Sequence, residues 1–156
     1  MVVRQYRFQD PYNTCGERNW NNCNKSEVNC AGYALGIFSW WQPTEYIDLS
    51  WLYSGVKTAR GRKSRLKRFI KLLLEDIPNL QRIPSIDEAP KGVEVIACRL
   101  GDLDFHFIRR ARNGHWLHKR GGLPSIHTMT TAEVFSDNWC DGKYYGEIAL
   151  FIKGAD

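Results

Sequence analysis

Three side chains of this sequence have the types and the order that nucleophilic catalysis needs. Cys30 stands where a polar segment turns into an apolar helix, and His106 lies in an apolar strand-like run about half the chain later. A second histidine, His118, follows on what reads as the next strand. A helix N-terminus lowers the pKa of a thiol, and a neutral imidazole within reach can take its proton. The order predicts an enzyme in which Cys30 attacks a carbonyl and His106 serves as general base and acid.

The group that orients the His106 ring is left open by the sequence. Asn113 and Gly114 predict a hairpin, and a strict two-residue loop would put His118 on the opposite face of the sheet from His106. A three- or four-residue loop, or a bulge, would bring both rings to one face. Asp104 shares the face of His106 and is the reserve candidate. The other histidines are expected in an exposed turn and in a loop: His115 and His127.

Hydrophobic spacing predicts helices in the first half of the chain and strands in the second. The expected helices cover 30–41 and 58–76, with a short turn at 48–53 between them. Residues 79–91 read as a connection. The expected strands follow it: 93–100, 104–111, 115–119 and 145–152. A capping-box pattern from Thr130 to Glu133 predicts a short helix before the last strand. This order favours one α+β domain over 1–156, with an irregular arm at 1–28.

The segment Asn29-Cys30-Ala31-Gly32-Tyr33-Ala34 resembles the nucleophile motif of the NlpC/P60 branch of papain-like cysteine peptidases and amidases. In that family the cysteine at a helix start is followed by a histidine on one strand and a polar third residue, often histidine, about a dozen residues further on. Cys30, His106 and His118 match that order. The resemblance implies a papain-like core, in which an N-terminal nucleophile helix packs on an antiparallel sheet. The basic helix at 57–77 would be an insertion in that core.

The predicted reaction is cleavage of an amide or isopeptide bond in a peptide or protein through an acyl-enzyme on Cys30. Acyl transfer or deamidation would use the same Cys–His pair. Groups around the pair are candidates for contacts with substrate or with a developing oxyanion: Asn29, Ala31, Tyr33 and Asp104. No cofactor and no metal are expected, because the gaps between Cys15, Cys23 and Cys30 are longer than those of zinc knuckles.

Charge supplies an alternative function. The chain has 22 Lys and Arg against 17 Asp and Glu, and residues 57–71 hold eight of the basic residues and no acid. A non-enzymatic module that binds nucleic acid or an acidic partner through this helix is the second hypothesis, with tryptophans such as Trp40, Trp41 and Trp51 as stacking surfaces. A solvated helix face is the simpler interpretation of the same charges.

Cysteine number and hydropathy bear on the compartment. The five cysteines are an odd number, and without an export signal they are expected to be reduced; Cys98 reads as a buried strand residue. No run approaches the ~20 apolar residues of a membrane span, and the first residues lack the apolar core of a signal peptide. A cytoplasmic location is therefore expected, with signal-less secretion or release by lysis left open. Oligomeric state is left open too.

Overall fold

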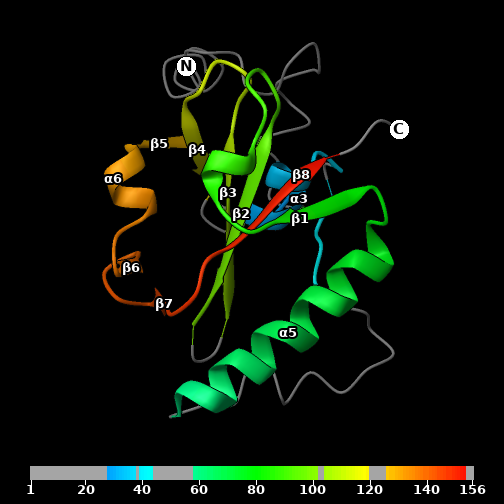
Figure 1. Cartoon of the computed structure of the whole chain (residues 1–156), viewed down its shortest axis with the longest axis vertical. Helices are drawn as coiled ribbons and strands as arrows, with labels where there is room; N and C mark the ends of the chain where they lie inside the picture. The colour runs from blue at the N-terminus through cyan, green and yellow to red at the C-terminus, as the bar shows by residue number, and fades with distance from the viewer. Residues whose placement is uncertain (1–27, 38, 44–57, 102–103, 120–125, 154–156) are drawn as a thin grey trace.

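A six-stranded antiparallel sheet organises the protein (Figure 1). The computed structural model describes residues 28–37, 39–43, 58–101, 104–119 and 126–153. The strand order is β1-β8-β2-β3-β4-β5, and every neighbouring pair runs antiparallel. The strand bounds are β1 Leu80–Ile83, β2 Val95–Leu100, β3 Phe105–Arg110, β4 Trp116–Lys119, β5 Ile126–Met129 and β8 Ala149–Lys153. The sheet and its helices confirm the α+β prediction.

Two helices cover one face of this sheet. Helix α3, Cys30–Leu35, begins at its N-cap Asn29 and stops at Gly36, which takes a left-handed φ of 72°. The prediction of a helix over 30–41 was therefore too long, because Gly36 ends the helix early. Helix α5, Ala59–Asp76, has Thr58 as its N-cap and agrees with the predicted 58–76. The predicted turn at 48–53 and nearly all of the arm at 1–28 lie outside the described residues.

The strands differ from the prediction at the sheet edges and near the C-terminus. Strand β1 and a 3-10 turn at Ile86–Glu88 lie within 79–91, the predicted connection. The strand was missed because its two middle residues both face outward, which breaks the alternation expected of a strand. The last strand begins at Ala149 rather than at 145. Residues before it form a small separate sheet instead: β6 Asn138–Trp139 and β7 Tyr144–Tyr145. The predicted capping box is present and opens α6, Thr131–Val134.

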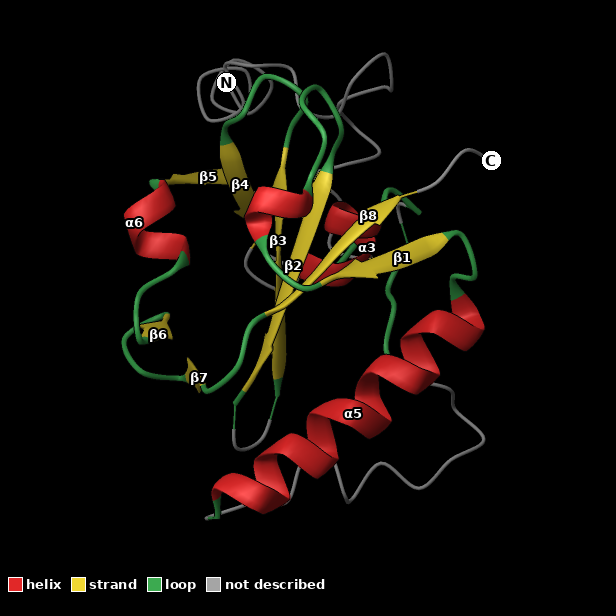
Figure 2. Ribbon diagram, viewed as in Figure 1, coloured by secondary structure: helices red, strands yellow, loops and turns green. Residues whose placement is uncertain are grey.

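The sheet lies between α3 and α5 on one side and α6, β6 and β7 on the other (Figure 2). Apolar side chains pack in a layer on each of its faces. The layer under α3 and α5 contains Phe105 and Phe107 of β3, and Phe69 of α5 lies 5.4 Å and 6.1 Å from their ring centroids. The opposite layer lies under α6, β6 and β7 and contains Ile108, Trp116 and Trp139, among others. Cys98 is fully buried in the first layer, as predicted. No helix in the described ranges is both long enough and apolar enough to cross a bilayer.

Candidate active site

The loop between β3 and β4 decides which face His118 occupies. The N–H of Ala111 donates to the His115 carbonyl at 2.8 Å, and the N–H of Gly114 donates to the Ala111 carbonyl at 2.9 Å. Gly114 has a φ of 93°. These bonds define a three-residue loop in which a turn is followed by a left-handed glycine. The register pairs Arg110 with Trp116, so side chains of even number on both strands share one face.

His106 and His118 are in direct contact on that face. Nε2 of His106 lies 2.8 Å from Nδ1 of His118, and their ring planes are nearly perpendicular at 89°. Both residues are only 3% exposed. One ring must donate and the other accept, so each nitrogen of this contact constrains the tautomer of its partner. Of the two groups that the sequence left open as orienter, His118 makes this hydrogen bond.

Two aromatic residues wall the His106 ring. Tyr144 stacks on it with ring centroids 5.1 Å apart, and Trp139 meets it edge-on at 6.1 Å. The Tyr144 hydroxyl donates to Oδ2 of Asp104 at 3.5 Å, and Oδ1 of Asp104 accepts the Phe105 N–H at 2.7 Å. Burial, and then the Asp104 charge, raise the pKa of Tyr144, so this phenol stays a neutral donor. Asp104 thus holds the phenol that stacks on His106.

Cys30 sits at the start of α3, against β3. Its sulfur accepts backbone hydrogen bonds from Phe107, the residue after His106, and from Ala31. The β3–β4 ladder pairs only Arg109 with Leu117 and Arg110 with Trp116, so it ends before it reaches Phe107. The Ala111 N–H points toward β4, where it donates to His115. Successive amides of a strand face opposite neighbours, so the Phe107 N–H, four residues earlier, points toward β4 as well. The sulfur therefore lies where β3 and β4 separate.

The Cys30 thiol is not ionised at neutral pH in this structure. Burial raises its pKa to about 12, and the Asp104 charge adds to the increase. The N–H groups of Phe107 and Ala31 and the charge of Lys119 lower the pKa by less. The helix start lowers this pKa as expected, through the Ala31 N–H, but burial of Cys30, a residue only 5% exposed, outweighs it. The proton of Cys30 needs an acceptor when the sulfur reacts.

Folding stability is expected to fall at alkaline pH because of this thiol. The unfolded chain loses the Cys30 proton near the ordinary pKa of 9.0, whereas the folded chain keeps it until about 12. Between those values the unfolded state binds fewer protons, so stability decreases by up to about 1.4 kcal/mol per pH unit for this group. Urea unfolding between about pH 8 and 11 should show a steeper loss for the wild type than for Cys30→Ala. Equal slopes in the two proteins would contradict the buried neutral thiol.

Asn29 holds the start of α3 in place. Its Oδ1 accepts the N–H of Gly32 at 2.9 Å and the N–H of Trp41 at 3.1 Å, and its Nδ2 donates to the Trp41 carbonyl at 2.7 Å. Asn29 is 3% exposed. The side chain thus caps the helix and joins it to the segment that follows. Its observed role is to position Cys30.

Asn29→Ala is expected to destabilise the fold by about 2–3 kcal/mol. The substitution removes the cap and leaves the buried N–H and carbonyl of Trp41 without their bonds to Asn29. Asn29→Asp keeps the acceptor for Gly32 and Trp41 but places a carboxylate oxygen against the buried Trp41 carbonyl, so its loss comes from that side of the cap alone. Chemical denaturation of both variants measures the difference. Equal losses in the two would show that the acceptor bonds contribute little.

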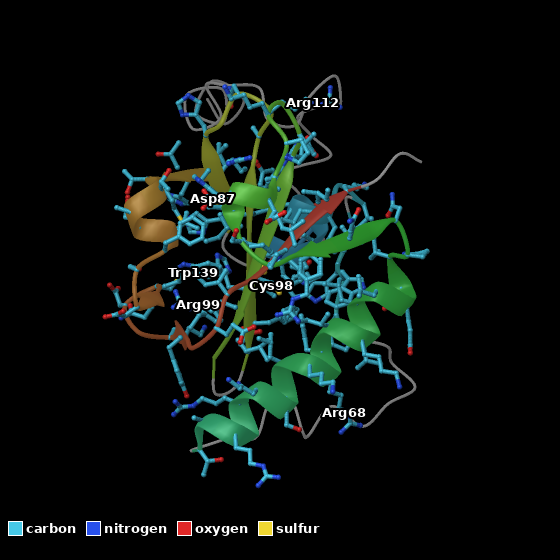
Figure 3. All side chains as sticks on the ribbon, viewed as in Figure 1. Arg68, Asp87, Cys98, Arg99, Arg112 and Trp139 are labelled. Atoms are coloured by element: carbon cyan, nitrogen blue, oxygen red, sulfur yellow. The ribbon has the colours of Figure 1, made fainter. Side chains whose placement is uncertain are left out.

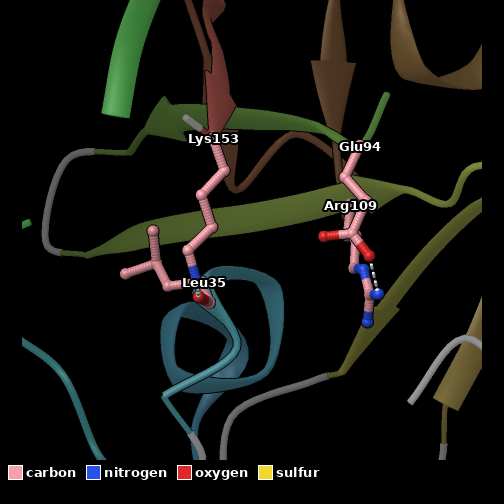
Figure 4. A network of polar contacts seen from close by, with 4 residues as sticks. All are labelled: Leu35, Glu94, Arg109 and Lys153. Atoms are coloured by element: carbon pink, nitrogen blue, oxygen red, sulfur yellow. Dashed lines mark hydrogen bonds and ion pairs between the residues drawn. The ribbon is translucent and has the colours of Figure 1, made fainter. Parts of the chain in front are cut away.

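Two cations of the sheet, the half-buried Lys153 and the buried Arg109, lie against α3; Figure 4 shows their bonds to Leu35 and Glu94. Nζ of Lys153, at the end of β8, donates to the Leu35 carbonyl at 2.9 Å. Arg109 of β3 pairs with Glu94, and its guanidinium lies 5.8 Å from the ring centroid of Tyr33. Tyr33 is fully buried there, so it packs under Arg109. Ala31 is fully buried as well and presents its backbone N–H to Cys30.

Several residues near His118 and Cys30 were not predicted from the sequence. His127 was expected in a loop but belongs to β5, where it pairs with His118 at a ring distance of 5.9 Å. Lys119 is fully buried on β4 and donates to the Val28 carbonyl, two residues before Cys30. The alternation of Ile126-His127-Thr128-Met129 is the only sequence signal for β5, and four residues are too few to distinguish a strand from a loop.

Arg99 is a further buried neighbour, since it pairs with His106 across β2 and β3. Its Nε donates to the Gly146 carbonyl at 3.0 Å and its NH2 to the Asp137 carbonyl at 2.8 Å. Its guanidinium lies 5.3 Å from the Trp139 ring, and Figure 3 shows the two side chains together beside β6 and β7. Arg99 thereby ties to the sheet the segment that carries Trp139 and Tyr144, the two rings that contact His106. The feature of the sequence that could have indicated this role is a single arginine within the apolar run from Val93 to Leu100.

Comparisons with known proteins assign no family to the chain. No protein-family model matches it, and neither the curated proteins nor the solved structures include a significant match. Within the described part of the chain, no group of three or more His, Cys, Asp or Glu side chains is arranged to hold a metal ion. The function proposed below therefore rests on the geometry of this chain.

Proposed function

We propose that the protein is a thiol hydrolase that cleaves an amide or isopeptide bond in a peptide or protein. Cys30 is the nucleophile, His106 is the general base and acid, and His118 orients the His106 ring. The observation that carries the proposal is the 2.8 Å contact between Nε2 of His106 and Nδ1 of His118. It lies on the two strands against which the Cys30 helix packs. The His106 and His118 rings project into the layer opposite α3, where His106 meets Tyr144 and Trp139. Cys30 belongs to the layer on the α3 side, and its link to His106 is the N–H of Phe107, the next residue of β3, which donates to the Cys30 sulfur. A cysteine and an oriented imidazole are the groups that thiol acyl transfer requires.

The tautomers follow from the contact. His106 acts as base through Nδ1, since Nε2 is bonded to His118. It therefore carries its proton on Nε2 and donates it to Nδ1 of His118. When Nδ1 gains the thiol proton, the resulting imidazolium is stabilised by the same bond. Because the pKa of Cys30 is about 12, the proton moves to His106 as the sulfur attacks, without a preformed thiolate.

The reaction then runs in two halves. The Cys30 sulfur bonds to the carbonyl carbon, His106 returns the proton to the leaving amine, and the C–N bond breaks to give a thioester. Water, deprotonated by His106, attacks the thioester and releases a carboxylic acid and the free thiol. An amine or thiol in place of water would make the protein an acyltransferase, and a side-chain amide substrate would make it a deamidase. Cys30 and His106 are 5% and 3% exposed, so the side chains that cover them must part before substrate enters.

An NlpC/P60-like papain core is part of the proposal. The supporting facts are the order of helix and strands, the nucleophile at the start of α3, and the two histidines on the neighbouring strands β3 and β4. Helix α5 would be the insertion between the nucleophile and the sheet.

Turnover of a panel of fluorogenic peptide amides and isopeptides by the full chain tests this function. Cys30→Ala should abolish hydrolysis, while Cys140→Ala, at a half-buried thiol in a turn, should retain it. Intact-mass analysis during turnover should show an acyl group on Cys30 alone. Hydrolysis that survives Cys30→Ala would refute the assignment.

A further inference from the structure

Helix α5 presents a straight line of cations on its outer face. Arg60, Lys63, Lys67 and Lys71 are all exposed and are spaced by three, four and four residues, which places them along one side of the helix. We call these four residues the basic stripe. The stripe extends over roughly 16 Å at 1.5 Å per residue. Arg68 flanks it and also points away from the sheet in Figure 3.

The basic stripe has no acidic partner within the described part of the chain. The ion pairs found there, Arg82 with Glu147 and Arg109 with Glu94, use none of its residues. The first turn of α5 has no acid either, although the helix dipole favours acids there and disfavours cations. Arg60, in the first turn, therefore opposes helix formation. Charges that disfavour the fold and pair with nothing inside it are suited to an external anion.

The opposite face of α5 restricts the kind of partner. Its apolar residues are buried against the sheet, including Leu66, Phe69 and Leu73. A helix that lies on a membrane needs an exposed apolar face to insert, and α5 has none to offer. Tyr145 lines a hollow beside Lys63, but the Arg62 guanidinium lies over its ring at 4.6 Å from the centroid, so it adds no open row of rings on which single-stranded bases would stack. A regular row of cations alone is complementary to a regular row of phosphates on a duplex.

We infer that the basic stripe binds the phosphate backbone of a nucleic acid duplex without reading its sequence. Four phosphate contacts give a slope of about −3.5 for log K against log salt concentration, and a dissociation constant of about 10⁻⁴–10⁻⁶ M at physiological salt. The surface is separate from Cys30 and His106. Its binding is measured without turnover, so failure of either proposal leaves the other standing.

Fluorescence anisotropy with a labelled duplex DNA of random sequence tests the inference. The variant K63Q/K67Q/K71Q should bind about tenfold or more weakly at low salt, and its salt slope should flatten by about 2.5. The matched control K91Q/R112Q/K143Q removes the same charge from exposed sites elsewhere and should keep the slope and most of the affinity. Circular dichroism establishes that both variants are folded.

Three results would overturn the inference. One is the absence of measurable duplex binding by the wild type at low salt. Another is an equal loss in the stripe variant and the control, which would reduce the effect to net charge. The third is stripe-dependent binding to phosphatidylserine vesicles, or to polyglutamate, that exceeds binding to DNA.

Discussion

His106→Ala is expected to lower the rate of Cys30 acylation by about 10²–10⁴-fold while leaving the fold intact. The Cys30 thiol, with a pKa of about 12, has almost no thiolate at neutral pH. The variant would leave the sulfur without the base that accepts its proton, so only the rare thiolate would react. The affected quantity is kcat/KM for amide hydrolysis, or the acylation rate in a single turnover.

Variants of His118 separate orientation from general acid–base catalysis. His118→Ala removes the acceptor 2.8 Å from Nε2 of His106 and should slow acylation less than His106→Ala does. His118→Asn keeps an oxygen near the position of Nδ1 and should retain more activity than His118→Ala. His115→Ala changes an exposed histidine on the same hairpin and serves as the control. Full activity of His106→Ala would remove His106 from the mechanism.

Gly32→Ala is expected to destabilise the protein by about 3 kcal/mol or more, the largest loss of stability that we predict for one methyl group. A Cβ at Gly32 would lie 1.7 Å from the carbonyl oxygen of Ser39 and 2.9 Å from its carbonyl carbon. Both atoms are backbone, so the segment after α3 would have to move. Alanine normally favours a helix over glycine by about 1 kcal/mol, so a loss can come only from this contact.

The same contact explains why position 32, two residues after Cys30, is a glycine. Gly32 makes room for the backbone of Ser39. Gly92→Ala is the matched control, because Gly92 has a φ of 75° and open space where a Cβ would stand. It should cost only about 1–2 kcal/mol through backbone strain. Urea unfolding measures both, and a Gly32→Ala protein as stable as the wild type would contradict the close approach.

The predictable parts of the fold are those with strong local signals. The spacing of apolar residues placed α5 to within a residue, and the capping box placed α6. Strands β2 to β4 coincide with strand-like apolar runs of the sequence, and their predicted bounds lie within two residues of the observed ones. Helix α3 was too long in the prediction because apolar residues continue past Gly36, whose conformation depends on the chain around it.

The parts of the site that escaped prediction depend on tertiary structure. Asn113 and Gly114 identify the hairpin, but the loop length that puts His118 beside His106 follows from strand pairing. The pKa of Cys30 depends on burial, which a helix-start pattern does not report. Arginine and lysine side chains usually lie at the surface. Arg99 and Lys119 are buried only because other elements pack over the strands that carry them. Local sequence thus indicates the candidate groups, whereas packing sets their geometry and protonation.

The most direct test of the Cys30–His106 pair is the pH profile of Cys30 alkylation by iodoacetamide, read by peptide mass spectrometry with Cys98 and Cys140 as internal references. If His106 is the base, the Cys30 rate in the wild type rises to a plateau between about pH 5 and 8, where imidazoles titrate. In His106→Ala the plateau disappears, and the rate climbs with pH toward the alkaline range of a buried thiol. Identical profiles in the two proteins, without a plateau in either, would contradict the account.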